Sequence, residues 1–121
     1  DGNIIWEKFV GDTTGILSSG AMDLAIDSTG KIYVAGGTSV SSFEGASGAN
    51  MFLVKYDASG NKIWAKRFGA NQADAAKGIA IDSSDNIFIT GDTKGNLDGN
   101  TGIDSSQDIF LMKFNTSGDK L

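Results

Sequence analysis

The fold is decided by two stretches of sequence, DSTGKIYVAG at residues 27–36 and DSSDNIFITG at residues 82–91. Each stretch begins with polar turn residues and continues into a short run of β-branched and aromatic residues. This order predicts a tight turn followed by a β-strand. Because the same pattern occurs twice in one chain, the sequence indicates a repeated structural unit.

The repeat extends outward from these two stretches. GNIIWEKFVG at residues 2–11 recurs as GNKIWAKRFG at residues 60–69, and FLVKY at 52–56 recurs as FLMKF at 110–114. These pairs are 58 residues apart (60 − 2 and 110 − 52), whereas the deciding stretches are 55 apart (82 − 27). The overall period is therefore constant, because one loop of the second repeat is three residues shorter and another is three residues longer. Such length differences are expected in loops rather than in strands.

Each repeat is predicted to contain four short strands. In the first repeat we place them at residues 22–27, 31–35, 51–56 and 62–68, where apolar residues alternate or run continuously. No segment shows the periodicity of a helix. Four antiparallel strands per period describe one blade of an all-β propeller.

The connections between the strands are of two kinds. Four tight turns begin with Asp or Asn and have Gly or Asp in fourth place: Asp27 to Gly30, Asp57 to Gly60, Asp82 to Asp85 and Asn115 to Gly118. The first side chain is expected to cap the turn, and the fourth residue to adopt the left-handed conformation. The long connections are residues 12–21, 37–50, 70–76 and 91–107. In an up-and-down sheet the tight turns lie at one end and the long connections at the other, where recognition is usually located.

These strings resemble the SBBP β-propeller repeat of bacterial and archaeal surface proteins, over nearly the whole chain. The resemblance implies a secreted or cell-surface protein, and the family supplies no catalytic residues to transfer. Asp85 departs from the pattern, because glycine is expected at that place in the turn.

The phase of the repeat predicts how the blades are divided. Residues 3–10 form the outer strand of a preceding or neighbouring blade, residues 21–69 form blade one, and residues 76–121 form blade two without most of its outer strand. A chain that begins at Asp1 is expected to be processed or excised.

Two blades are fewer than the four to eight of a closed propeller. The ring is completed either by further blades of a longer chain or by further copies. For isolated chains we expect residues 3–10 to complete blade two of a neighbour, so that three or four chains give six or eight blades. Residues 1–5 and 117–121 would then overlap.

Composition excludes several kinds of chemistry. The 121 residues include no Cys, His or Pro, and the net charge is −5, with Glu7 and Glu44 as the only glutamates among fifteen acids. Disulfides, thiolate nucleophiles, imidazole bases and ordinary zinc sites are therefore excluded. No basic run predicts nucleic-acid binding, and no apolar run is long enough for membrane insertion. We expect a protein that is not an enzyme and needs no cofactor, unless calcium binds.

The connection after Gly91 contains the candidate ligand-binding residues Asp92, Asn96, Asp98 and Asn100. Asp98, Asn100 and Asp104 have a spacing that would offer oxygen ligands to Ca²⁺. The segment lacks the glycine and the bidentate Glu of an EF-hand. A solvated loop of Asx turns is the competing interpretation, and we favour it.

Two further residue types recur once per repeat. Trp6 and Trp64 suggest platforms for sugar stacking, but a tryptophan repeated at one strand position is more typical of packing, which we favour. Lys55 and Lys113 are expected to lay their stems on apolar neighbours or to pair with an Asp. Paired Asp side chains suitable for glycoside hydrolysis are not excluded.

The predicted function is a non-catalytic propeller scaffold for extracellular recognition, adhesion or protein interaction through the long connections. A lectin-like propeller that binds a glycan ligand is the alternative, and a hydrolytic propeller enzyme is the third.

Overall fold

The computed structural model describes residues 2–10, 19–39, 42–43, 46–47, 50–70, 74–95, 97 and 107–121. The described residues form β-strands, turns and irregular segments without a helix, which confirms the all-β prediction. The strands are β1 (Ser19–Ile26), β2 (Ile32–Thr38), β3 (Ser42–Phe43), β4 (Ala46–Ser47), β5 (Met51–Tyr56), β6 (Lys62–Phe68), β7 (Asp74–Ile81), β8 (Ile87–Thr93) and β9 (Asp108–Phe114). None of the described residues therefore belongs to an apolar helix of the length that crossing a membrane requires.

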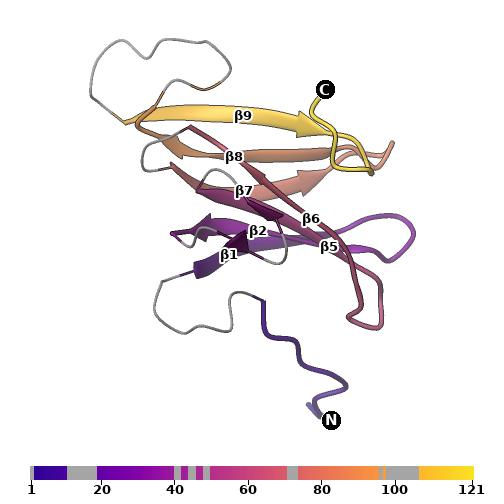
Figure 1. Cartoon of the computed structure of the whole chain (residues 1–121). Helices are drawn as coiled ribbons and strands as arrows, with labels where there is room; N and C mark the ends of the chain where they lie inside the picture. Colours follow the sequence, from indigo (N-terminus) through magenta and orange to yellow (C-terminus); the bar gives the residue numbers. More distant parts are fainter. Residues whose placement is uncertain are drawn as a thin grey trace.

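The strands form two main antiparallel sheets. The four-stranded sheet has the order β1-β2-β5-β6, and the three-stranded sheet has the order β7-β8-β9. An isolated bridge pairs Phe114 with Lys120, as Tyr56 pairs with Lys62 in the four-stranded sheet. The short pair β3-β4 lies within residues 37–50, where no strand is predicted. Figure 1 shows all tight turns at one end of the sheets.

The observed strands differ from the predicted ones mainly at the end of the long connections. β5 and β6 have the predicted bounds, but β1 begins three residues early at Ser19, β2 extends to Thr38, and β7 begins at Asp74 within the predicted loop 70–76. The added residues are mostly Gly, Ala, Ser and Thr, which carry no alternating apolar pattern. They become strand because a neighbouring strand supplies backbone hydrogen-bond partners, as in the pairing of Ser19 with Thr38.

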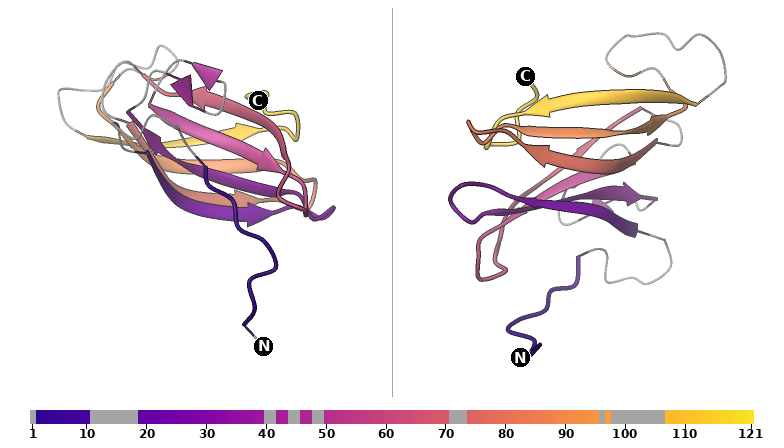
Figure 2. Two further views of the ribbon diagram at one scale, coloured as in Figure 1. Left: turned by 60° about the horizontal axis from the view of Figure 1, so that its bottom comes forward. Right: turned by 180° about the vertical axis from the view of Figure 1, so that it is seen from behind.

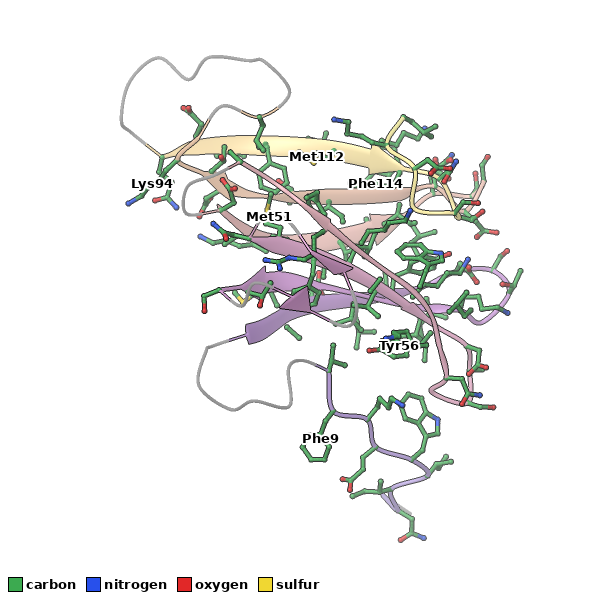
Figure 3. The ribbon with its side chains drawn as sticks, viewed as in Figure 1. Phe9, Met51, Tyr56, Lys94, Met112 and Phe114 are labelled. Carbon is green, nitrogen blue, oxygen red and sulfur yellow. The ribbon has the colours of Figure 1, made fainter. Side chains whose placement is uncertain are left out.

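The two sheets pack face to face. Buried residues of the four-stranded sheet meet buried residues of the three-stranded sheet in one core: Tyr33, Ala35, Met51 and Leu53 on the first side, and Ala76, Ile87, Ile89, Phe110, Met112 and Phe114 on the second. Phe68 from β6 contacts Phe114 with ring centroids 5.2 Å apart. Figure 2 shows the two layers from two further directions, and Figure 3 shows Met51, Met112 and Phe114 between them.

Both sheets also carry apolar residues on the side that faces away from this core. On the four-stranded sheet, Phe52, Val54 and Tyr56 form a second buried cluster, to which Val10 of the N-terminal segment contributes. On the three-stranded sheet, Ile109 and Leu111 are 84% and 72% exposed. A strand with apolar residues on both faces is expected where each sheet lies between two neighbours.

The glycine that ends each deciding stretch lies opposite a β-bulge. The register of β1 with β2 shifts between Ala21 and Asp23, and that of β7 with β8 shifts between Ala76 and Gly78. A Cβ atom on Gly36 or Gly91 would lie 2.0 Å from the carbonyl oxygen of Gly20 or Ala75, respectively. Only glycine fits at this place, because the bulge brings the two backbones together.

We therefore expect Gly91→Ala to lower the free energy of unfolding by roughly 3 kcal/mol, since the neighbouring backbone of Ala75 must move. The matched control is Gly20→Ala, whose added methyl group meets no atom within 4 Å. It should change stability by less than about 0.5 kcal/mol. Urea denaturation followed by far-UV circular dichroism measures both values, and equal effects of the two substitutions would contradict the bulge constraint.

Candidate functional site

The strand ends that lead into the long connections gather at one end of the molecule, here called the long-connection end. Register places Asp74 beside Thr93, and Thr93 beside Asp108. Thr38 lies at the corresponding place in the four-stranded sheet, opposite Ser19. Thr38, Asp74 and Thr93 are buried, so a buried polar layer lies at this end of the sheets.

Asp74 is the centre of this layer. Its Oδ1 accepts a hydrogen bond from Thr93 Oγ1 at 2.5 Å, and its Oδ2 accepts one from the backbone N–H of Ala70 at 2.6 Å. The carboxylate therefore joins the chain after β6 to the end of β8. Sequence reasoning missed this residue because its counterpart in the first repeat is Ser19, so no acid recurs at this place.

Asp92, one of the predicted ligand-binding residues, is engaged within the three-stranded sheet. Its Oδ2 forms an ion pair with Lys77 and accepts a hydrogen bond from Gln107 Nε2 at 2.8 Å. Lys77 lies at the bulge of β7 and Gln107 immediately precedes β9, so Asp92 of β8 links β7 to the start of β9. Asp92 has a structural role that the sequence did not indicate.

The other predicted ligands, Asn96, Asp98, Asn100 and Asp104, lie outside the described residues. Within the described part of the chain, no group of three His, Cys, Asp or Glu side chains is placed to hold a metal ion. The calcium site remains a sequence-based prediction.

The two tryptophans pack against tight turns. The half-buried Trp64 meets Tyr33 edge to face, with ring centroids 6.0 Å apart, and its Nε1 donates to the carbonyl oxygen of Thr116 at 3.3 Å. Trp6 lies against Gly60, where an added Cβ would be 3.1 Å from the ring. These contacts give Trp64 a packing role, whereas Trp6 lies on a turn and is 44% exposed.

The four tight turns share one hydrogen-bond pattern. The backbone N–H of the fourth residue donates to the carbonyl of the first at 3.0–3.1 Å. The first side chain, Asp27, Asp57, Asp82 or Asn115, accepts from the backbone N–H groups two and four residues later. Gly30, Gly60, Asp85 and Gly118 have φ between 60° and 82°. Each turn thus satisfies its own backbone donors, as Asx turns do.

Asp27 is the most buried of the capping carboxylates. Burial opposes its charged form, but hydrogen bonds from the Thr29 hydroxyl, from the N–H groups of Lys31 and Thr29, and from the Tyr33 hydroxyl outweigh burial and lower the pKa of Asp27. The pKa values of Asp57 and Asp82 are also lowered, mainly by hydrogen bonds from Asn61 and Asn86. The turns are therefore most stable when these carboxylates are ionised.

Asp85 connects the turns of the two sheets. Its Oδ1 accepts from the backbone N–H of Ser28 at 2.9 Å, and its Oδ2 accepts from Ser28 Oγ at 2.6 Å. Its φ is 60°, a conformation that Asp tolerates better than most residues. The departure from glycine therefore has a physical reason, because the carboxylate binds the neighbouring turn.

The lowered pKa of Asp27 predicts an acid-sensitive fold. A carboxyl whose pKa is lower in the folded state contributes stability above its unfolded pKa of about 4, and this is lost as pH falls through the folded pKa. The wild-type urea midpoint should fall on acidification from pH 6, and less steeply in Asp27→Asn. Asn115 already caps the fourth turn, so the variant should keep its fold. Identical pH slopes for the two proteins would contradict this role of Asp27.

The contact between the turns predicts energetic coupling. In a double-mutant cycle of Ser28→Ala and Asp85→Gly, we expect a coupling free energy of about 1 kcal/mol from the Oγ–Oδ2 hydrogen bond. The control cycle pairs Asp85→Gly with Ser59→Ala on another turn and should be additive. Urea denaturation measures both cycles, and additivity in the first would remove the proposed link.

Known proteins give three similarities. Residues 63–98 match the family model of the β-propeller repeat SBBP. The regulatory protein FlaEY of Caulobacter vibrioides is 28% identical over 129 residues, covering 97% of this chain and 13% of that protein. The WD repeat-containing protein L264 of Acanthamoeba polyphaga mimivirus is 32% identical over 103 residues, covering 74% of this chain and 7% of that protein. The chain thus spans a small part of each relative's length.

The matched residues run from β6 through β8 and include the second deciding stretch and its tight turn. Two stacked antiparallel sheets with a common turn, bulge and register are the arrangement expected of neighbouring propeller blades. The resemblance seen in the sequence is thereby confirmed for residues 63–98, which match the β-propeller repeat SBBP.

Proposed function

We propose that the chain is a non-catalytic propeller scaffold that recognises a protein or peptide through the long-connection end. The observation that carries this proposal is the difference between the two ends. At the tight-turn end, the same hydrogen bonds within each turn recur in both repeats, and Asp85 adds a link between two of the turns. At the other end the connections differ between the repeats in length and sequence, as expected where a rigid scaffold carries recognition.

The relatives support a scaffold role. One is named a regulatory protein and the other a WD repeat-containing protein. WD repeats form propellers of four-stranded blades, which present loops around a central channel. By the resemblance to surface-protein repeats we place the chain outside the cell or on its surface, as part of the same proposal.

The tryptophan contacts bear on the lectin alternative. Trp64 is held by Tyr33 and Thr116, and Trp6 lies on the turn at Gly60, so neither is presented at the long-connection end. A glycan would need to bind through the polar residues of the connections instead. Among the described carboxylates, Asp74 and Asp92 are both occupied by hydrogen bonds within the fold. These contacts favour protein recognition over glycan binding or hydrolysis.

A peptide-display selection tests the proposal, alongside a glycan array and a panel of glycoside and ester substrates. We expect selected peptides whose affinity falls at least about 10-fold when residues 98–104 are replaced by Gly and Ser at equal length. The control, Ser59→Lys with Ser117→Lys, alters only the tight-turn end and should leave binding unchanged. Glycan binding without turnover would favour the lectin alternative, and turnover would favour the enzyme; either would overturn the scaffold proposal.

A further inference from the structure

The contact between the two sheets contains a specific polar element beside the apolar core. The carbonyl oxygen of Thr116, in the last tight turn, accepts hydrogen bonds from Lys55 Nζ at 2.9 Å and from Trp64 Nε1 at 3.3 Å. Lys55 Nζ also lies 5.1 Å from the centre of the Tyr33 ring. A Lys, a Trp and an aromatic ring of one sheet therefore hold the turn of the next.

The outer face of the three-stranded sheet repeats this element, and none of the described turns lies opposite it. Lys113, 58 residues after Lys55, lies 5.0 Å from the ring of Phe88, the counterpart of Tyr33. Lys113 Nζ is also 3.7 Å from Asp82. A hollow of about 270 Å³ opens beside them, lined by Phe88, Leu111, Met112, Lys113, Lys120 and Leu121. The face has the residues to hold a turn, except for the tryptophan.

The equivalent tryptophan of the repeat is Trp6, in the N-terminal segment. Trp6 lies against Gly60, with an added Cβ 3.1 Å from its ring, as Trp64 lies against Gly118 at the same 3.1 Å. Val10 packs on the cluster of Phe52, Val54 and Tyr56, at the place that Phe68 has on Phe114. The N-terminal segment thus packs on the four-stranded sheet as β6 packs on the three-stranded sheet, and residues 2–10 pair with none of the described strands.

We propose that the outer face of the three-stranded sheet binds a second copy of this chain, through that copy's N-terminal segment and its turn at residues 57–60. In this junction Trp6 of the second copy lies beside β9 of the first copy, next to the bridge between Phe114 and Lys120. Lys113 and Trp6 both donate to the carbonyl oxygen of Ala58, as Lys55 and Trp64 do to Thr116. Asp57 stands where the internal contact has Asn115, which adds a negative charge near Lys113 and favours the junction.

The junction forms between copies because of how the surfaces are arranged. The N-terminal segment lies on the far side of the four-stranded sheet, away from the outer face of the three-stranded sheet (Figure 1). In Figure 3, Phe9 on this segment points away from the ribbon, and it is 90% exposed. A junction of one face with a different face is head-to-tail, so repeating it closes a ring or extends a filament.

The repeat also sets the register. In the four-stranded sheet, Leu53 pairs with Lys66 and Lys55 pairs with Trp64. Adding 58 to the β5 residues gives Leu111 and Lys113 of β9, and subtracting 58 from the β6 residues gives Lys8 and Trp6 of the N-terminal segment. The junction therefore pairs Leu111 with Lys8, and Lys113 with Trp6, of the second copy. Cα atoms of paired residues in antiparallel strands are close enough for a disulfide.

The chain contains no cysteine, so an engineered pair reports this contact without interference. We expect Leu111→Cys with Lys8→Cys to form covalent oligomers on oxidation, seen on non-reducing gels and reversed by dithiothreitol. The control pair, Leu111→Cys with Lys94→Cys, has its second cysteine on an exposed residue just beyond β8 and should give at least about 10-fold less cross-linked product. Equal cross-linking of the two pairs, or none in either, would overturn the proposal.

Association without a cross-link gives a second readout. Sedimentation velocity of the wild-type chain should show concentration-dependent oligomers, and Lys113→Met should weaken the association about 10-fold by removing a charged hydrogen-bond donor. Lys94→Met is the matched control and should leave it unchanged. Far-UV circular dichroism verifies that both variants are folded. A folded wild-type chain that stays monomeric at every concentration, or equal effects of the two variants, would overturn the junction.

Discussion

The structure depends on one constraint: each sheet is apolar on both faces and needs a neighbour on each. The contact between the four-stranded and three-stranded sheets satisfies this requirement once, through Tyr33, Leu53, Ile89 and Met112. On the outer face of the four-stranded sheet Val10 of the N-terminal segment packs on the buried cluster, and on the outer face of the three-stranded sheet Ile109 and Leu111 are exposed. Both sheets have the same bulge, the same glycine opposite it and the same tight turns. Further blades or further chains complete the ring.

Much of this arrangement is readable in the sequence because the repeat itself supplies the comparison. Residues that recur at a fixed spacing, such as Trp6 with Trp64 and Asp27 with Asp82, have the same local role, so the turns and most strands are predictable. The ends of the strands are harder to predict, because Ser19 and Thr38 belong to strands through their pairing with each other. Local residue pattern does not contain that information.

The candidate site is harder to predict for the same reason. Asp74 and Lys77 have no acidic or basic counterpart in the first repeat, where Ser19 and Met22 stand, so the period does not mark them. Asp92 is predicted to bind a ligand, and its contacts with Lys77 and Gln107 are visible only in the structure. Side chains that differ between repeats hold the long-connection end together, and only the folded arrangement reveals which of them meet.

The link between Asp85 and Ser28 distinguishes the first repeat from the second. Both repeats have serine at the second turn position, Ser28 and Ser83, but only the second has an acid at the fourth, where the first has Gly30. The bond therefore forms when the second repeat follows the first and is lost if their order is exchanged. The two repeats are therefore not interchangeable at this contact, because Asp85 fixes their order along the chain.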